Sequence, residues 1–177
     1  MGDRPGVLTP YLRNKRIRAV KPHLTGRVLD FGCHVGVLAE HIDPDLYLGV
    51  DVDGDALEVA RHHHPAHRFQ LLDHLIVDDG FDTIVAMAVV EHLGDTDSFF
   101  RKTREWIAPN GRLVVTTPDG RFDSLYHLAG QLRMVGRHDE HDSYMDRRGF
   151  ERAPGWRLAE YRRFLLGVNQ LAVFRPA

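Results

Sequence analysis

Short apolar runs alternate with helically spaced segments along the chain, and turn residues separate the two kinds of segment. Buried parallel strands read as nearly continuous apolar runs, whereas helices repeat apolar residues every third or fourth position. The pattern predicts buried strands that begin at Val28 and that cover residues 46–50, 69–72, 81–89 and 112–117. It predicts helices over 11–24, from the turn after the first strand to about residue 42, over 56–62, around Phe99 and Phe100, and over 124–135. Residues 156–164 and 168–174 are expected to form an antiparallel pair with a turn at Gly167.

Turn and cap residues refine two of these elements. The sequence Ala108-Pro109-Asn110-Gly111 is typical of a tight turn and is expected to precede the fifth strand. The helix before it is expected to be capped near Asp95 or Asp97, with Trp106 buried near its end. The alternation of strand and helix predicts one α/β domain with a largely parallel sheet.

The stretch from Val28 to Gly36 is the clearest candidate for a ligand site. It reads as a strand that meets Asp30, breaks into a glycine-spaced turn and restarts with helical spacing. Glycines let a backbone approach a bound molecule, and free amides at a helix start donate to polar or anionic groups. The G-x-G-x-x-G spacing of dinucleotide-binding turns is absent, because Gly32 and Gly36 lie four apart with His34 between them. The turn therefore indicates a nucleoside-type ligand and leaves its identity open.

A second candidate follows the second predicted strand. Asp51 stands about twenty residues after the glycine turn, where nucleoside-binding α/β folds place a carboxylate on ribose hydroxyls. The alternative role is a helix N-cap, for which Asp53 and Asp55 are better placed. The sequence therefore favours Asp51 as a ligand-binding residue.

Composition and charge narrow the class of protein. The 177 residues are 43% hydrophobic and 27% charged, and the formal charge of -2 gives no basic footprint for nucleic acid. The single cysteine, Cys33, excludes an internal disulfide and favours a reducing compartment. The start of the sequence lacks the apolar core of a signal peptide, and no apolar run is long enough to span a bilayer. A cytoplasmic protein with one domain over residues 1–177 is expected.

Two conspicuous patterns have simpler explanations than function. The segment 11–24 is basic and amphipathic, but its apolar side is thin and carries no Trp or Phe, so a solvated helix face is preferred over a membrane anchor. The histidines at 62–64 and 67 lack a paired Cys or carboxylate spacing, which favours a solvated helix end over a metal site. No metal site is expected.

Four segments together resemble one protein family. Residues 28–36, Val-Leu-Asp-Phe-Gly-Cys-His-Val-Gly, are similar to the first motif of class I S-adenosylmethionine-dependent methyltransferases, and Gly-Val-Asp at 49–51 is similar to the second. Residues 81–93 resemble the fourth-strand segment of the ubiquinone-biosynthesis type of O-methyltransferase, and residues 107–118 resemble its turn and fifth strand. Each motif alone is weak, but the four in this order and spacing are specific.

The resemblance implies a fold and a cofactor site. The fold is a Rossmann-like seven-stranded sheet of order 3-2-1-4-5-7-6, with the seventh strand antiparallel and helices on its flanks. The cofactor, S-adenosylmethionine, would lie across the carboxyl ends of the strands. Its contacts would be the backbone of Gly32, Cys33, His34 and Gly36 at the methionine part, Asp30 at that turn or at the methionine amino group, Asp51 at the ribose hydroxyls, Val52 at the adenine face, and Asp73 with the amide of His74 at the adenine edge.

The chain departs from the family pattern at two positions. His34 stands where the family usually has glycine, but histidine tolerates a positive φ, so the turn is expected to form. Ala88 replaces the first glutamate of a Glu-x-x-Glu-His pattern that binds a divalent ion in some relatives, which leaves Glu91 and His92. A hard cation requires several oxygen ligands, so metal dependence is not expected.

The chemistry implied is methyl transfer to a small-molecule acceptor, for which a hydroxyl is the default. A base within hydrogen-bond reach assists such a transfer, and His92, after the fourth strand, is the first candidate. His127, His138 and His141 are second choices. The acceptor pocket is expected between an N-terminal helix or lid, 1–24, and a cap segment, 119–149. Alternatives are a glycan or lipid-linked acceptor, a cofactor-binding protein without catalysis, and, less favoured, a nicotinamide dehydrogenase. The sequence leaves monomer and homodimer open.

Overall fold

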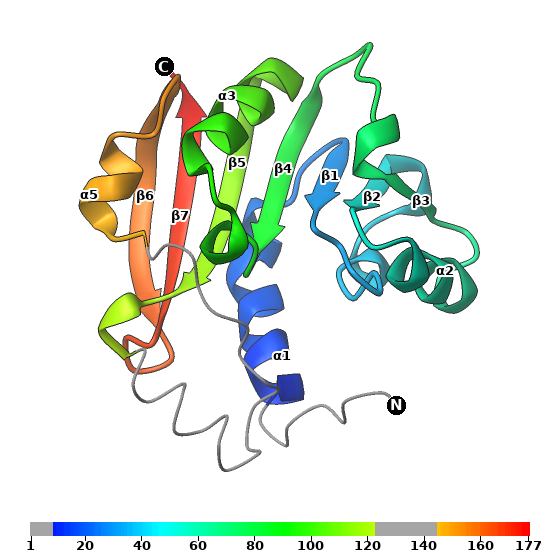
Figure 1. Ribbon diagram of the computed structural model, residues 1–177, viewed down its shortest axis with the longest axis horizontal. Coiled ribbons are helices and arrows are strands. Elements are labelled where there is room, and N and C mark those ends of the chain that lie inside the picture. Colours follow the sequence, from blue (N-terminus) through cyan, green and yellow to red (C-terminus); the bar gives the residue numbers. More distant parts are fainter. Residues whose placement is uncertain (1–8, 123–144) are drawn as a thin grey trace.

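A seven-stranded mixed sheet forms the centre of the computed structural model, which describes residues 9–122 and 145–177 (Figure 1). The strand order is β3-β2-β1-β4-β5-β7-β6. Strands β1 to β5 are parallel to one another, and β7 is antiparallel to both β5 and β6. The predicted order and the reversed strand are both confirmed. The strands are β1 Val28–Phe31, β2 Tyr47–Asp51, β3 Arg68–Leu71, β4 Phe81–Met87, β5 Ile107–Pro118, β6 Trp156–Phe164 and β7 Asn169–Pro176.

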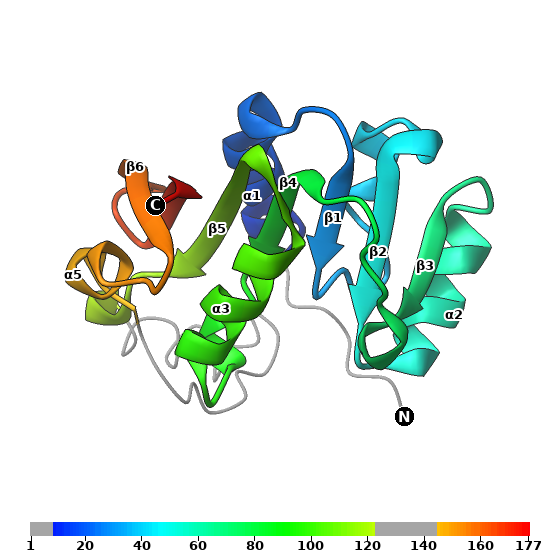
Figure 2. The same cartoon turned by 90° about the horizontal axis from the view of Figure 1, so that it is seen from above.

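Helices cover both faces of the sheet (Figure 2). The α-helices are α1 Thr9–Val20, α2 Gly54–His63, α3 Thr96–Trp106 and α5 Arg147–Glu151. Ile17 and Val20 of α1 pack on Val85 and Val114, which lie on one face of β4 and β5. Phe99 and Phe100 of α3 and Phe150 of α5 pack on the other face, together with Ile84 and Leu113. The sheet is thus buried between layers, as its continuous apolar strands predict.

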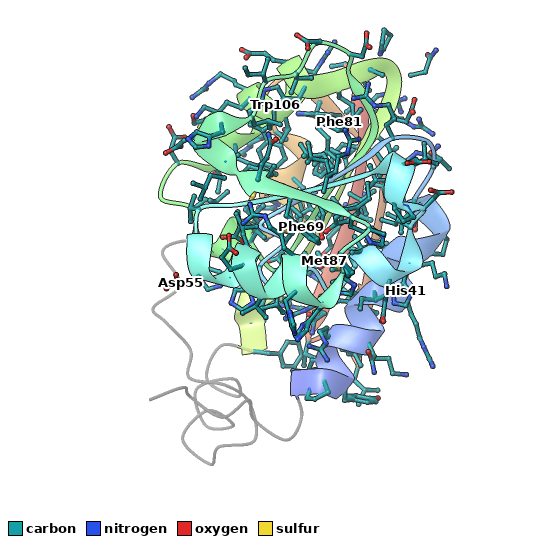
Figure 3. All side chains as sticks on the ribbon, turned by 90° about the vertical axis from the view of Figure 1, so that its right-hand side faces the viewer. His41, Asp55, Phe69, Phe81, Met87 and Trp106 are labelled. Atoms are coloured by element: carbon teal, nitrogen blue, oxygen red, sulfur yellow. The ribbon has the colours of Figure 1, made fainter. Side chains whose placement is uncertain are left out.

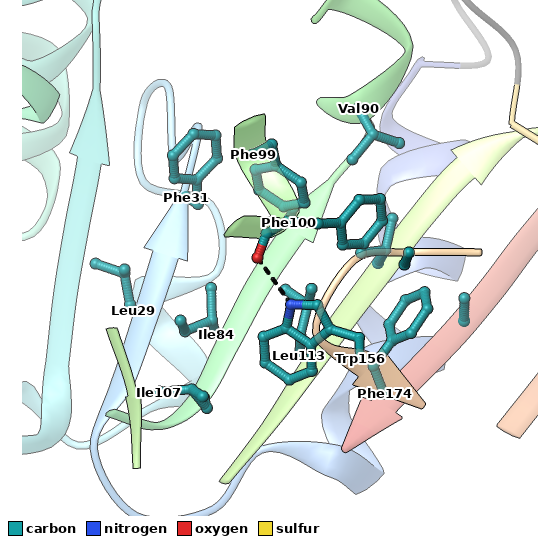
Figure 4. Packing of buried hydrophobic residues seen from close by; sticks show 14 of the residues in the cluster. Leu29, Phe31, Ile84, Val90, Phe99, Phe100, Ile107, Leu113, Trp156 and Phe174 are labelled. Carbon is teal, nitrogen blue, oxygen red and sulfur yellow. Dashed lines mark hydrogen bonds between the residues drawn. The ribbon is translucent and has the colours of Figure 1, made fainter. Parts of the chain in front are cut away.

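An aromatic cluster fastens the C-terminal hairpin to α3 (Figure 4). The indole Nε1 of Trp156 donates a 2.9 Å hydrogen bond to the Phe100 carbonyl. The Phe100 and Phe174 rings meet edge to face with centroids 5.4 Å apart. Such pairs contribute about 0.5–1.5 kcal/mol beyond their burial. Strand β7 is therefore anchored by α3 as well as by its ladder with β5.

The expected helix after the glycine turn is absent. Residues 34–38 form turns, and only a 3-10 helix, Ala39–His41, follows them. Gly36 has a φ of 74°, outside the helical region, and a Cβ there would lie 2.8 Å from the Phe69 ring. The segment also meets Asp43-Pro44 within a few residues, and proline cannot continue a helix. The prediction is wrong because Gly36 fixes the backbone where Phe69 packs.

Two local expectations are corrected at the other end of the sheet. The predicted turn at 108–111 lies inside β5, as a bulge between the pairs Phe81–Ile107 and Thr83–Arg112. Gly111 permits it, because a Cβ there would lie 2.8 Å from the Phe81 carbonyl oxygen. Trp106 is half-buried rather than buried, at the end of α3, and packs against the edge of the core. The predicted helix 124–135 lies outside the described residues.

Candidate functional site

The candidate residues gather where the parallel strands end. The turn 32–36 follows β1, Asp51 ends β2, Asp73 follows β3, and residues 88–92 follow β4. Figure 3 labels Phe81 and Met87, the two ends of β4, and Asp55, in the first turn of α2, stands at about the height of Met87 in that view. Ligands of open α/β sheets bind at this carboxyl edge. The structure therefore brings these predicted segments to one edge.

Hydrogen bonds from β2 hold the glycine turn. The amides of Gly32 and Cys33 both donate to the Val50 carbonyl, at 2.8 and 3.0 Å. The amide of Gly36 donates to the Cys33 carbonyl at 2.8 Å and closes the turn. Cys33 is buried, and its side chain packs in a cluster that includes Tyr47. The turn thus offers backbone rather than the thiol to a ligand.

Gly32 is required by both conformation and space. Its φ is 72°, which favours glycine, and a Cβ there would lie 2.5 Å from Cγ2 of Val89. Val89 belongs to the segment after β4, so the glycine turn and that segment are in close contact. A side chain at position 32 would push the two apart.

His34 does not break the turn. Its φ is 46°, so the expectation that histidine adopts a positive φ here is confirmed. Its amide donates a 2.7 Å hydrogen bond to Oδ2 of Asp51, and its side chain is exposed. The histidine is therefore held by its backbone, and its ring lies at the surface of the turn.

Asp51 has a structural role in addition to the predicted one. Oδ2 accepts from His34 N, and Oδ1 accepts from Asp53 N at 3.0 Å. A carboxylate has about four lone-pair sites, so two backbone bonds leave acceptors for hydroxyl groups. Asp53, not Asp51, caps α2, since its Oδ1 accepts from the amides of Asp55 and Ala56. The next residue, Val52, is 75% exposed, so its side chain is available to a ligand at this edge.

Asp30 lies beneath the turn, buried among side chains. It is 2% exposed, and its Oδ2 accepts a 2.8 Å hydrogen bond from the Tyr47 hydroxyl. Burial raises the pKa of the Asp30 carboxyl to about 7, and the bond from Tyr47 acts in the opposite direction. The amides of the turn donate to the Val50 carbonyl and to the Asp51 carboxylate, whereas Asp30 accepts from Tyr47, a partner that sequence reasoning missed.

Asp73 and His74 lie after β3, in a 3-10 helix, Leu72–His74. Both residues are exposed. Strand β3 pairs with β2, with Leu71 opposite Asp51, so this short helix follows the strand next to Asp51. Asp73 and His74 are thus available at the end of the sheet where the adenine contact was expected.

The chain turns sharply where it leaves β4, at the carboxyl edge of the sheet. Ala88 has a φ of 57°, and its amide donates to the Thr116 carbonyl at 2.7 Å. A 3-10 helix, Val90–His92, follows, and its last two side chains differ in environment. His92 is exposed, whereas Glu91 is 1% exposed and accepts a 2.9 Å hydrogen bond from the Thr117 hydroxyl.

Glu91 was not among the predicted site residues. Burial raises the pKa of its carboxyl, while the bond from Thr117 lowers it. The signal in the sequence was an acid directly after an apolar strand, beside the candidate base His92. His127, His138 and His141 lie outside the described residues. Within 9–122 and 145–177, no group of three or more His, Cys, Asp or Glu side chains is placed to hold a metal ion.

Solved structures share this fold. A protein from Pyrococcus horikoshii superimposes with a TM-score of 0.73 at 19% identity, over 93% of this chain and 91% of the other. An S-adenosylmethionine-dependent methyltransferase from Clostridium acetobutylicum gives a TM-score of 0.67 at 12% identity, over 95% and 90%. At these identities the likeness concerns the fold, which is that of a Rossmann-like methyltransferase.

The sequence comparison establishes the family. A family model described as a methyltransferase domain matches residues 8–154, most of the chain, and the chain belongs to this family. The ubiquinone biosynthesis O-methyltransferase of a Chelativorans species is 40% identical over 113 residues, which cover 56% of this chain and 43% of that protein. The mitochondrial enzyme of that name from Bos taurus is 28% identical over 127 residues, 61% and 34%. The chain thus matches less than half the length of these relatives, and the resemblance seen in its motifs is confirmed.

Proposed function

We propose that the protein transfers a methyl group from S-adenosylmethionine to a hydroxyl of a small molecule. One observation carries the proposal: the turn 32–36 is bonded to Val50 and Asp51, with Val52 exposed beside it, at the edge where the parallel strands end. The names of the relatives support the reaction, since they are O-methyltransferases. The formal charge of -2 supports a small acceptor rather than nucleic acid.

Different residues at this edge would bind different parts of the cofactor. The backbone of Gly32, Cys33, His34 and Gly36 would face the methionine part, with Asp30 beneath it. The free lone pairs of Asp51 would accept the two ribose hydroxyls, which suits a carboxylate. Val52 would cover one face of the adenine, and Asp73 with the amide of His74 would contact its edge.

The chemistry requires positioning and a place for one proton. S-adenosylmethionine supplies a sulfonium-bound methyl group, and the acceptor oxygen forms a bond to that carbon as the carbon–sulfur bond breaks. His92, exposed at the same edge, would take the hydroxyl proton. Holding the two reactants in line can lower the barrier by roughly 7–11 kcal/mol. The acceptor pocket stays assigned to the expected lid, 1–24, and cap segment, 119–149, of a single domain, and both segments lie partly outside the described residues.

Calorimetry tests cofactor binding. The wild-type chain is expected to bind S-adenosylmethionine and S-adenosylhomocysteine but not NAD. Asp51→Ala is expected to weaken that affinity about 10- to 100-fold, since hydrogen bonds to a charged group contribute about 1.5–3 kcal/mol. Asp45→Ala, an exposed acid before β2, is the matched control and should leave affinity unchanged. Equal affinities for the two variants would remove Asp51 from the site.

A transfer assay then tests the reaction. Phenols, sugars and lipid-linked hydroxyl compounds are offered with S-adenosylmethionine, and S-adenosylhomocysteine formation is measured. His92→Ala should lower turnover about 10²–10⁴-fold with cofactor affinity retained, whereas His62→Ala, an exposed histidine on α2, should not. Cofactor binding without transfer to any compound would favour a non-catalytic binding protein. Cys33, the single cysteine, supports the further expectation of a reducing, cytoplasmic compartment.

A further inference from the structure

The turn between β6 and β7 contains two leucines in an unfavourable conformation. The amide of Gly167 donates to the Phe164 carbonyl at 3.1 Å, which closes a four-residue turn. Its central residues, Leu165 and Leu166, have φ values of 53° and 56°. Gly167 follows with a φ of 93°, and the loop between the paired residues Phe164 and Asn169 has four residues. Positions with positive φ favour glycine, asparagine or aspartate rather than leucine. A residue with a Cβ loses roughly 1–2 kcal/mol in this conformation.

Burial does not compensate for that strain at Leu166. Its side chain is fully exposed, the most exposed of the large apolar residues in the described part of the chain. A leucine here gains neither a relaxed backbone nor a place in the core. A position that combines a strained backbone with an exposed apolar side chain is one where a function is expected.

The hairpin tip lies beside helix α1, and an open apolar groove of about 670 Å³ runs between them. Arg162 Nη2 donates to the Ala19 carbonyl at 3.2 Å, and Arg16 Nε donates to Asn169 Oδ1 at 2.9 Å, so side chains fasten the two elements to each other. The apolar lining includes Tyr11, Leu12, Phe164, Leu165, Leu166 and Val168. The hairpin therefore supplies the aromatic and aliphatic surface that the helix lacks when its sequence is considered alone.

Cations border the groove. Lys15, Arg18 and Arg162 line it, and none of the described residues that line it is acidic. The ammonium of Lys15 lies 5.3 Å from the centre of the Tyr11 ring, and the guanidinium of Arg162 lies 5.9 Å from that of Phe164. Glu160, outside the groove, forms an ion pair with Arg162 at 3.4 Å and offsets its charge. Lys15 and Arg18 therefore contribute most of the positive charge of the groove. Apolar side chains flanked by cations match the boundary between acyl chains and anionic headgroups.

We propose that the groove, with α1 and the hairpin tip as its two sides, docks on the surface of a membrane that contains anionic lipids. Leu166 would enter the acyl region, and Lys15 and Arg18 would contact the headgroups. A fully exposed leucine at a hairpin tip can insert into a bilayer, whereas a protein partner would need a concave pocket to receive it. No helix in the described part of the chain is long and apolar enough to span a membrane.

The docked orientation would place the candidate site at the bilayer. Asn169, the first residue of β7, pairs with Pro118, the last residue of β5, so the hairpin tip lies at the carboxyl edge of the sheet. An acceptor with an apolar tail could then reach the edge without leaving the bilayer. This consequence rests on the proposed function, whereas docking itself does not.

Vesicle flotation of the full chain without cofactor tests docking. The chain should float with vesicles of equal parts phosphatidylglycerol and phosphatidylcholine, and not with phosphatidylcholine alone. Lys15→Glu with Arg18→Glu should weaken binding by at least about 25-fold, from roughly fivefold for each lost cation. Arg68→Glu with Arg157→Glu, two exposed arginines on β3 and β6, is the matched control and should bind far more tightly than the first pair.

Glycine substitutions separate docking from folding. Leu166→Gly relieves the turn and should weaken vesicle binding about 10-fold or more, because burial of a leucine is lost. Ile76→Gly, at another exposed apolar residue away from the groove, should leave binding unchanged. Equal binding by these two variants, or no preference of the wild type for anionic vesicles, overturns the proposal. Binding of an acidic amphipathic peptide in place of vesicles would also overturn it, in favour of a protein partner. Each of these results is independent of methyl transfer.

Discussion

The glycine turn after β1 and the leucine turn between β6 and β7 lie at the same edge of the sheet, and both contain residues with positive φ. In the first turn, Gly32 and Gly36 have no space for a Cβ, because Val89 and Phe69 lie within 2.8 Å of where it would be. In the second, Leu166 is surrounded by solvent. Packing thus determines which residue stands at Gly32 and Gly36 but not at position 166, so Leu166 calls for a reason outside the fold.

Among variants that test this comparison, Gly32→Ala is expected to have the largest effect on stability. The new Cβ meets Val89, and the positive φ is unfavourable for alanine, so we expect a loss of about 2–4 kcal/mol in the free energy of unfolding. Cofactor affinity should fall with it, because the backbone of the turn moves. Urea unfolding and calorimetry measure the two effects.

Gly54→Ala is the control for that experiment. Position 54 begins α2, and a Cβ there would meet only Leu71 Cδ2, at 3.9 Å. Stability should stay within about 1 kcal/mol of the wild type or rise, because alanine favours a helix. A Val89→Ala change in the Gly32→Ala background should restore part of the lost stability. If it restored none, steric contact with Val89 would not be the cause.

Asp30 and Tyr47, the hydrogen-bonded pair beneath the glycine turn, are expected to have an intermediate effect on stability. Because the pKa of Asp30 is raised to about 7, the folded state holds a proton that the unfolded state releases near pH 4. Stability should therefore fall as pH rises from about 5 to about 7, by about 2–3 kcal/mol. Urea unfolding between pH 5 and 8 measures it, and Asp30→Asn should flatten the profile.

The Tyr47→Phe variant tests the contribution of the Tyr47 hydroxyl to the same pair. The variant removes the donor to Asp30 and keeps the ring, so the pKa of Asp30 should rise further. The added loss of stability should be about 1.5–3 kcal/mol at pH 8, where the wild-type carboxylate is charged, and smaller at pH 5. A loss of equal size at both pH values would point to packing of Tyr47 instead.

Leu166→Gly gives the smallest expected effect, and its sign is opposite. Glycine adopts positive φ without strain, and no buried surface is lost, so unfolding should require about 1 kcal/mol more. Ile76→Gly, where φ is not positive, should instead lower stability by about 0.5–1 kcal/mol. Thermal unfolding distinguishes the two signs.

The strands were predictable because apolar runs are local, whereas their order followed only from the family that the four motifs together resemble. The absent helix after Gly36 was not, since its cause is Phe69, on a strand distant in sequence. Likewise, the Asp30–Tyr47 bond depends on the register of β1 and β2, which places Asp30 opposite Gly49. At the leucine turn the sequence predicted only a turn at Gly167. The groove beside it joins segments 143 positions apart, which no local pattern reveals.

The insertion of β7 between β5 and β6 has a consequence for how the chain folds during synthesis. One edge of β5, which carries Leu113 and Val115, has its partner only in residues 169–176. Until the ribosome has released those residues, a nearly complete parallel sheet presents an open apolar edge, the kind of surface on which chains aggregate. Closure of that edge and docking of Trp156 on α3 then complete the domain in one late step.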